Sequence, residues 1–202
     1  MFSFVILSVS IFFFAIACYG QELGTLREKI VLLPGSDVAL AYGTIQCYDY
    51  DKYFVITAEP PASPGSNILV KRKADYDGSI ACSYIVEDKD FEVKNEWAEY
   101  FFGIYEDLLF VDSGTCPCPR LLIIYDISKK KEVYETSYSE TIEIDGSKLS
   151  FWFETEEANR ENCPNYDEIS HGISAAIETL VILDLKDFTL HKTDKTRCEH
   201  RM

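Results

Sequence analysis

The stretch Thr141-Ile-Glu-Ile-Asp-Gly-Ser-Lys-Leu-Ser-Phe-Trp-Phe153 carries the clearest fold signal in this chain of 202 residues. β-Branched and aromatic side chains, which favour extended strands, stand on both sides of Asp145-Gly146. An Asp-Gly pair between two such runs is among the strongest short-range signals for a β-hairpin. We therefore expect two antiparallel strands joined by a tight turn at this dipeptide.

Short runs of the same character recur along the chain, and turn residues separate them at intervals of roughly ten residues. This spacing predicts an all-β fold with minor α content: a single antiparallel β-sheet or sandwich-like domain built of hairpins and stapled by disulfides. Residues 96–104 and 167–178 carry apolar side chains at helical spacing, so we expect each to be a helix packed on the sheet. The expected strands are Ile30–Leu33, Val38–Tyr48, Tyr53–Thr57, Ile68–Lys71, Ser79–Val86, Leu108–Val111, Leu121–Tyr125, Glu132–Tyr138, Thr141–Ile144, Leu149–Phe153, Leu180–Leu183 and Phe188–Leu190.

Residues 122–133 and 180–190 share a loose pattern of strand, Asp, turn and strand. The pattern resembles the hairpin of a β-propeller blade, although a propeller needs about four four-stranded blades, more than this chain can supply. We use the repeat only to support antiparallel pairing within both segments.

Met1 to Gly20 contains no charged residue and ends its apolar run in the small residues Ala15 and Ala17. This is the layout of a secretory signal peptide, so residues 1–20 are predicted to be one. Residues 21–202 are then expected to form a single β-rich domain. The expected location is the secreted fraction, the periplasm or the cell envelope. Such compartments favour the oxidation of cysteines to disulfides.

The fate of the leader stays open between three alternatives. Cleavage near Ala17 or after Gly20 would release a free protein. The order Ala15-Ile-Ala-Cys18 resembles a bacterial lipobox, which implies lipidation of Cys18, although such leaders begin with Lys or Arg and the first basic residue here is Arg27. An uncleaved leader is about long enough to span a bilayer. We therefore expect membrane contact only through the N-terminus, if it is lipidated or uncleaved.

The charge of the chain limits its partners. With 34 acidic and 19 basic side chains the formal net charge is −15. An acidic surface repels phosphate backbones and anionic lipid head groups, so nucleic acid is not an expected partner. No cofactor motif is present, and no cofactor is expected. The expected partner is an unknown protein or small ligand.

Six cysteines remain when Cys18 is set aside, an even number that suits three disulfides. Cys116 and Cys118 are separated by one residue and cannot bridge to each other without strain. We expect these two to pair with the two C-terminal cysteines, which leaves the two N-terminal ones for each other. The six are Cys47, Cys82, Cys116, Cys118, Cys163 and Cys198.

A zinc site is the alternative use of these thiols. Cys116, Cys118, Cys198 and His200 offer thiolate and imidazole ligands, both suited to zinc. Their spacings are tighter than those of usual zinc sites, and export favours oxidation. We therefore expect no metal.

Phe110-Val-Asp-Ser-Gly-Thr115 places Asp-Ser-Gly-Thr directly after an apolar strand. This resembles the catalytic loop of pepsin-like aspartic proteases, in which two carboxylates share a proton. The resemblance implies Asp112 as the catalytic residue of an aspartic-type hydrolase. The chain departs from that pattern because it has no second Asp-Thr/Ser-Gly copy and continues into Cys116-Pro-Cys-Pro-Arg120. An ordinary turn, with Asp112 capping backbone amides, fits the same residues.

Two loops are expected to carry the function. Prolines stiffen residues 59–67 and 112–120, and stiff loops lose less entropy when they bind. Asp112 and Arg120 are the expected binding residues. The predicted function is that of an exported, disulfide-stabilised, non-catalytic envelope or secreted protein that binds a protein or ligand through rigid loops. The alternatives are a hydrolase centred on Asp112 and a membrane-anchored structural lipoprotein.

Overall fold

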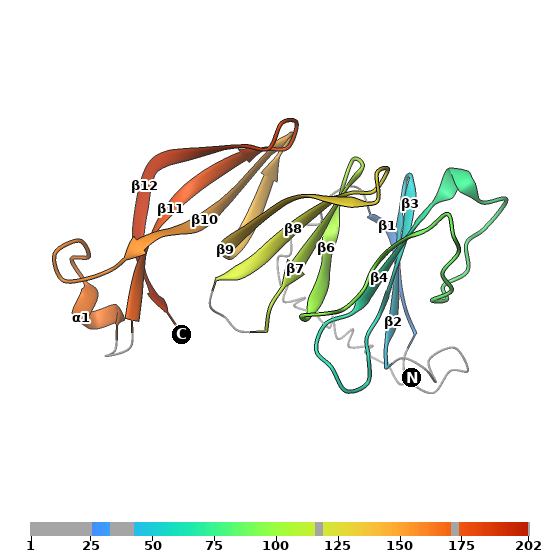
Figure 1. The fold of residues 1–202 in the computed structure, drawn as a ribbon, viewed down its shortest axis with the longest axis horizontal. Helices are drawn as coiled ribbons and strands as arrows, with labels where there is room; N and C mark the ends of the chain where they lie inside the picture. Colours follow the sequence, from blue (N-terminus) through green and yellow to red (C-terminus); the bar gives the residue numbers. More distant parts are fainter. Residues whose placement is uncertain (1–25, 33–42, 116–118, 171–173, 202) are drawn as a thin grey trace, which may run out of the picture.

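The computed structural model describes residues 26–32, 43–115, 119–170 and 174–201, which form two antiparallel β-sheets (Figure 1). The first sheet has five strands, and each pairs with the next along the chain. A short 3₁₀ turn, Lys73–Asp75, follows the fourth strand. The five strands are β1 (Leu26–Leu32), β2 (Ile45–Tyr50), β3 (Tyr53–Ala58), β4 (Asn67–Arg72) and β5 (Phe91–Val93).

The second sheet has seven strands, again in sequence order. A one-turn helix, α1 (Tyr166–Ile169), lies between its fifth and sixth strands. The seven strands are β6 (Glu99–Tyr105), β7 (Leu108–Ser113), β8 (Arg120–Asp126), β9 (Lys131–Asp145), β10 (Lys148–Glu157), β11 (Ser174–Asp184) and β12 (Thr189–Arg201).

The second sheet bends at β9, which belongs to two pairings. Its first half, residues 131–138, pairs with β8, whereas residues 139–145 pair with β10. Bulges interrupt the ladders of β9 with β8 and with β10, and a bulge bends its strand and increases the local twist. As a result, β6–β8 lie between the first sheet and the strands β9–β12 (Figure 1).

Two hydrophobic cores lie on opposite faces of β6–β8. The side chains of β7 alternate, so that Leu109 and Val111 face the first sheet while Phe110 faces the C-terminal strands. The core between the sheets contains Tyr50, Tyr53, Val55, Ile68, Val70, Phe91, Val93, Ile104, Leu109, Val111, Ile123 and Ile127. The core inside the curved second sheet contains Phe110, Leu122, Ile124, Tyr138, Ile142, Leu149, Phe151, Val181, Leu183 and Leu185.

Two smaller clusters lie under long connections, and a disulfide belongs to each. Ile80, Cys82 and Tyr84 of the β4–β5 connection pack on the outer face of the first sheet. At the other end of the molecule, residues 158–170 pack against β11 and β12 around the Cys163–Cys198 bridge. The connections are therefore covalently tied to the sheets that they cover.

The all-β prediction is confirmed, and so is its hairpin at Asp145-Gly146. Asp145 pairs with Lys148 across the turn, and Gly146 has φ +59°, a left-handed value that glycine adopts readily. The antiparallel pairing expected within residues 122–133 and 180–190 is also confirmed, by the hairpins β8–β9 and β11–β12.

The weak internal repeat reflects a shared turn. Asp126 and Asp184 follow their strands, and their side chains accept the amides of Lys129 and Lys186 at 3.0 Å each. The turns also place Lys130 and Phe188 in left-handed backbone, with φ +51° and +59°. These two residues thus occupy equivalent positions in two hairpins.

Three segments differ from the sequence-based expectation. Residues 79–86 are not a strand; Ile80, Cys82 and Tyr84 pack on the first sheet instead. Residues 96–104 are not a helix: a tight turn leads into β6, where Phe101 and Phe102 serve the two different cores. Residues 167–178 are also not one helix. A single helical turn ends at Ile169, and β11 begins at Ser174 as a strand flanked by β10 and β12. Burial of both faces of such a strand removes the alternation that distinguishes it from a helix.

Candidate functional site

The turn directly before β6 presents the most exposed of the large hydrophobic side chains described, Trp97, with 80% of its surface open to solvent. The turn backbone is nevertheless held firmly. The buried Glu99 carboxylate accepts the amides of Glu96 and Trp97 at 2.7 and 2.9 Å. In return, the Asn95 side chain accepts the Glu99 amide at 3.0 Å. The indole therefore projects from a backbone in which the amides of Glu96, Trp97 and Glu99 all donate hydrogen bonds.

The proline-rich loop of residues 59–67 packs against this turn. The Ser66 amide donates to the Glu99 carbonyl at 2.7 Å. Gly65 has φ +86°, and a Cβ on it would lie 2.6 Å from Ala98 Cα and 2.7 Å from the Glu99 nitrogen. Such distances are too short for any side chain, so glycine is required here for both its backbone conformation and its size.

The loop that joins β7 to β8 reaches the same turn from the other side. The Gly114 amide donates to the Ala98 carbonyl at 3.2 Å. Asp112 near the end of β7 and Arg120 at the start of β8 form two parallel contacts, Nε to Oδ1 at 2.6 Å and Nη2 to Oδ2 at 2.5 Å. Residues 116–118 lie outside the described residues. The two loops that the sequence singles out thus meet at the turn that carries Trp97.

Tyrosines complete the surroundings of Asp112 and Arg120. The Tyr138 hydroxyl donates to Asp112 Oδ1 at 2.8 Å, and the Arg120 guanidinium lies 5.4 Å from the ring centre of Tyr100. The hydrogen bond to Asp112 holds the pKa of Arg120 above its usual value. Burial, with the adjacent Asp112 carboxylate, raises the pKa of Tyr138. Both groups therefore stay protonated at physiological pH.

This geometry bears on the chemistry of Asp112. Both of its oxygens accept hydrogen bonds from Arg120, and Oδ1 also accepts the Tyr138 hydroxyl. An aspartic protease needs two carboxylates that share one proton, whereas the partner of Asp112 is a guanidinium. A bidentate guanidinium stabilises the charged carboxylate and fixes its orientation. Asp112 is therefore arranged as an anchor for Arg120.

We name Trp97, Tyr100 and Arg120 the aromatic platform. Tyr100 is 36% exposed and the Arg120 side chain 27% exposed, so both are partly accessible, whereas Trp97 is mostly exposed. Trp, Tyr and Arg are the residue types most enriched where alanine substitution strongly weakens protein–protein binding. The platform thus combines the composition of a binding hot spot with a fixed backbone.

Two disulfides lie in the described residues. Cys47 is joined to Cys82, as expected from the sequence, and the bridge ties the β4–β5 connection to β2. Cys163 is joined to Cys198, which ties the β10–β11 connection to β12.

The second bridge corrects one prediction. Cys163 and Cys198 were expected to pair with Cys116 and Cys118, but they pair with each other. The reason is the hairpin β11–β12, which places Cys198 opposite Ile177, beside the cluster of Ala158 and Cys163. Cys198 is consequently not a zinc ligand. Cys116, Cys118 and the leader with Cys18 lie outside the described residues.

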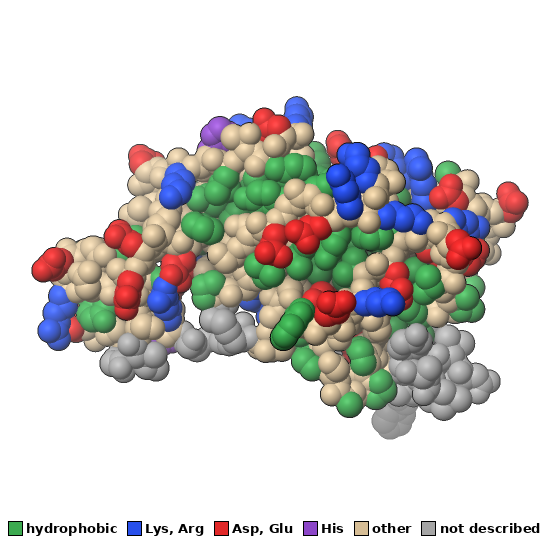
Figure 2. Space-filling model, in the orientation of Figure 1, with side chains coloured by type: hydrophobic (Ala, Val, Ile, Leu, Met, Phe, Trp, Pro, Cys, Tyr) green, Lys and Arg blue, Asp and Glu red, His purple; other side chains and the backbone are tan. Residues whose placement is uncertain are grey.

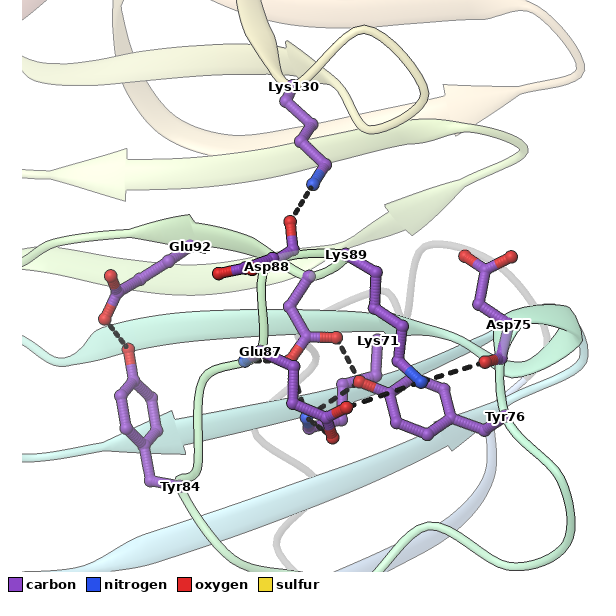
Figure 3. Close-up of polar contacts among 10 residues, drawn as sticks. Lys71, Asp75, Tyr76, Tyr84, Glu87, Asp88, Lys89, Glu92 and Lys130 are labelled. Carbon is purple, nitrogen blue, oxygen red and sulfur yellow. Dashed lines mark hydrogen bonds and ion pairs between the residues drawn. The ribbon is translucent and has the colours of Figure 1, made fainter.

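A second polar cluster has a buried centre, and its members contact one another. The Lys71 ammonium, 4% exposed, contacts the fully buried Asp90 carboxylate at 2.6 Å and the Tyr76 hydroxyl at 3.0 Å. Tyr76 also donates to Asp90. Figure 3 shows how Lys71, Tyr76 and Glu87 converge, and how Lys130 of the second sheet reaches the backbone of the same connection at Asp88. These contacts fix the β4–β5 connection on the first sheet.

Comparisons with known proteins give no family for this chain. No protein-family model matches it, and neither the curated proteins nor the solved structures yielded a match. Within the described ranges, no helix has the length and apolar character needed to cross a membrane. In the same residues, no group of three or more His, Cys, Asp or Glu side chains is placed to hold a metal ion.

Sequence reasoning named Asp112 and Arg120 but missed the residue between the two loops. Trp97 was assigned to the apolar face of a helix that does not form. A signal was available: Asn95 stands two residues before the tryptophan, and an Asn side chain readily bonds to nearby backbone amides and so favours turns. A second signal was the pair of proline-stiffened loops, residues 59–67 and 112–120, because both loops contact the same turn.

Proposed function

We propose that this chain is an exported, disulfide-stabilised, non-catalytic protein that binds a partner protein through the aromatic platform. The observation that carries the proposal is Trp97, an indole left 80% exposed on a turn that hydrogen bonds hold in place. Burial of an exposed tryptophan by a partner removes roughly 150–250 Å² from solvent.

The energetics favour a firm contact. At about 25 cal/mol per Å², burial of the indole contributes roughly 4–6 kcal/mol before the losses on association. The platform gives up little of this in ordering, because its backbone is already fixed by both loops. Replacement of a central tryptophan by alanine typically weakens binding by at least about 2 kcal/mol, or about 30-fold.

Charge and cysteine chemistry support the rest of the proposal. Two disulfides fit an oxidising compartment and the predicted leader of residues 1–20. A net charge of −15 favours a partner whose contact surface is basic.

Site-specific photo-crosslinking tests the proposal. A photoreactive phenylalanine analogue replaces Trp97 in one protein and Ile85 in the control, since Ile85 is also an exposed apolar residue, at 63%. Both are incubated with extracellular and cell-surface proteins of the source organism. We expect one protein to crosslink from position 97 and not from position 85. Unlabelled wild type should compete for it, and Trp97→Ala should not. Equal competition by unlabelled wild type and by Trp97→Ala would overturn the proposal.

The Asp112→Asn variant separates this function from the hydrolase alternative. A hydrolase centred on Asp112 would lose essentially all turnover of any substrate. Here, the variant weakens only the support of Arg120, so the crosslink from position 97 should persist with reduced affinity. Loss of a measurable hydrolytic activity in the variant, with binding unchanged, would favour the enzyme instead.

A further inference from the structure

A hollow of about 590 Å³ opens at the other end of β6–β8 from the aromatic platform. The strand β6 separates the two places by seven residues, or roughly 20 Å. Four hairpin turns line the hollow, namely those of β6–β7, β8–β9, β9–β10 and β11–β12. Figure 1 shows the turns of β6–β7, β8–β9 and β11–β12 along the upper edge of the molecule. The bend in β9 brings the last two turns to the same end as the first two.

The hollow continues the core of the curved sheet. Tyr105, Leu108, Leu185 and Phe188 line it, and all four belong to or pack against that core. The Phe188 ring stacks on Tyr134, with ring centres 5.7 Å apart and planes 14° from parallel. Figure 2 shows hydrophobic side chains gathered in the upper part of the view, with charged groups above and below them. One wall of the hollow is therefore apolar and partly aromatic.

The carboxylates at the rim are already satisfied. Asp107 accepts the Tyr53 hydroxyl at 2.8 Å and the Lys52 ammonium at 3.2 Å. Asp126 accepts Lys129 Nζ at 2.6 Å, and this contact helps to lower the pKa of Asp126 to about 2.

The remaining charged groups of the lining give no preference for an ion. Glu106 and Lys186 have opposite charges, so together they add no net charge. Because an ion would find no unbalanced charge, the lining is suited to an uncharged molecule.

Glu106 and Phe188 in the lining both have left-handed backbone, with φ +53° and +59°. For Phe188 this is the backbone of the shared turn, which Lys130 adopts in the equivalent hairpin. At the position of Phe188, glycine would also satisfy the turn, but it would not supply the ring that lines the hollow.

We propose that this hollow binds a small, uncharged molecule with a planar aromatic body. Its volume lies in the range of pockets that bury small ligands, roughly 300–1,000 Å³. Phe188 and Tyr105 would contact the ring system, while the turn backbone around Ser147 forms the opposite wall. The site is independent of the aromatic platform and does not rest on the proposed function.

The test is an NMR titration of the full mature chain with 2-naphthol as the neutral probe. Its anionic and cationic counterparts, 2-naphthoate and 2-naphthylmethylammonium, serve as charged comparisons. We expect 2-naphthol to shift the amide signals of Ser147, Leu185 and Phe188, and to bind at least as tightly as either ion. Shifts confined to other parts of the chain, or an affinity tenfold higher for one of the ions, would overturn the proposal.

The internal repeat supplies a matched control for the mutational arm. Phe188→Gly and Lys130→Gly both place glycine at a left-handed residue of equivalent turns, but only Phe188 lines the hollow. Phe188→Gly should weaken 2-naphthol binding at least tenfold, and Lys130→Gly should leave it unchanged. Should Phe188→Gly lose its folded spectrum, Ser147→Trp fills the hollow from the opposite wall and should abolish binding. Unchanged binding in Phe188→Gly or in Ser147→Trp contradicts the proposal.

Discussion

The buried pair of Lys71 and Asp90 gives a prediction whose size and pH dependence both follow from the structure. In Lys71→Met the fully buried carboxylate loses its cation but keeps the Tyr76 hydroxyl and the Glu87 amide, the latter at 2.9 Å. Removal of one partner of a buried ion pair typically costs about 3–5 kcal/mol. The two remaining hydrogen bonds place the expected loss of unfolding free energy at the low end, about 3 kcal/mol at pH 7.

The deficit should depend on pH in a defined direction. Burial alone would raise the pKa of Asp90, but the hydrogen bonds from Lys71, Tyr76 and Glu87 lower it below its usual value. In the wild type, this carboxylate therefore stabilises the fold above pH of about 4, and the contribution is lost as pH falls toward the lowered pKa. In Lys71→Met, burial without a cation raises the pKa of Asp90, so the variant is penalised above pH of about 4 and relieved below it. The difference in unfolding free energy between the wild type and Lys71→Met should therefore shrink as the pH is lowered.

Urea unfolding followed by circular dichroism at several pH values measures this difference. The control is Lys52→Met, because Lys52 and Asp107 form an exposed pair with side chains 65% and 51% open to solvent. That variant should lose less than about 1 kcal/mol. The reasoning is refuted if Lys71→Met costs no more than Lys52→Met, or if its deficit is the same at pH 3 as at pH 7.

Two further predictions concern the loops and their bridges. Gly65→Ala should destabilise the protein by about 3 kcal/mol and shift the fluorescence of Trp97, because its Cβ has no space beside the turn. Gly78→Ala has a similar φ of +90° but nothing within 4 Å of the new Cβ, so it should cost only about 1 kcal/mol and leave that fluorescence unchanged. Replacing both cysteines of either described disulfide by alanine should cost about 4 kcal/mol, and nearly the same for each, because both bridges span 35 residues. Calorimetry of the two paired variants would contradict this if only one of them were destabilised.

The class of the fold could be predicted because its signals are local. The Asp145-Gly146 turn and the alternating residues of β9 depend only on neighbours in the sequence. The segments that failed depend on distant contacts. Ile80 and Tyr84 have β-favouring neighbours, yet they cover a sheet that lies elsewhere in the chain. The bend of β9, which creates the second core, has no sequence signal strong enough to place it.

Only the part of the candidate site that depends on local sequence could be predicted. Asp112 and Arg120 are close in sequence at the two ends of one loop, so their contact follows from a hairpin. The turn that carries Trp97 is contacted by Gly65 and Gly114, which come from two different parts of the chain. An aromatic residue at helical spacing looks the same in sequence whether it is buried or exposed.

The central claim is that the exposed indole stands on a rigid turn, and amide hydrogen exchange measured by NMR tests it most directly. The amides of Ser66, Trp97 and Gly114 each have an acceptor, so they should exchange at least about 100-fold more slowly than in an unstructured peptide. Exchange of these three amides at the rate of an unstructured peptide would show that the turn and its two loops are flexible, which would contradict the account.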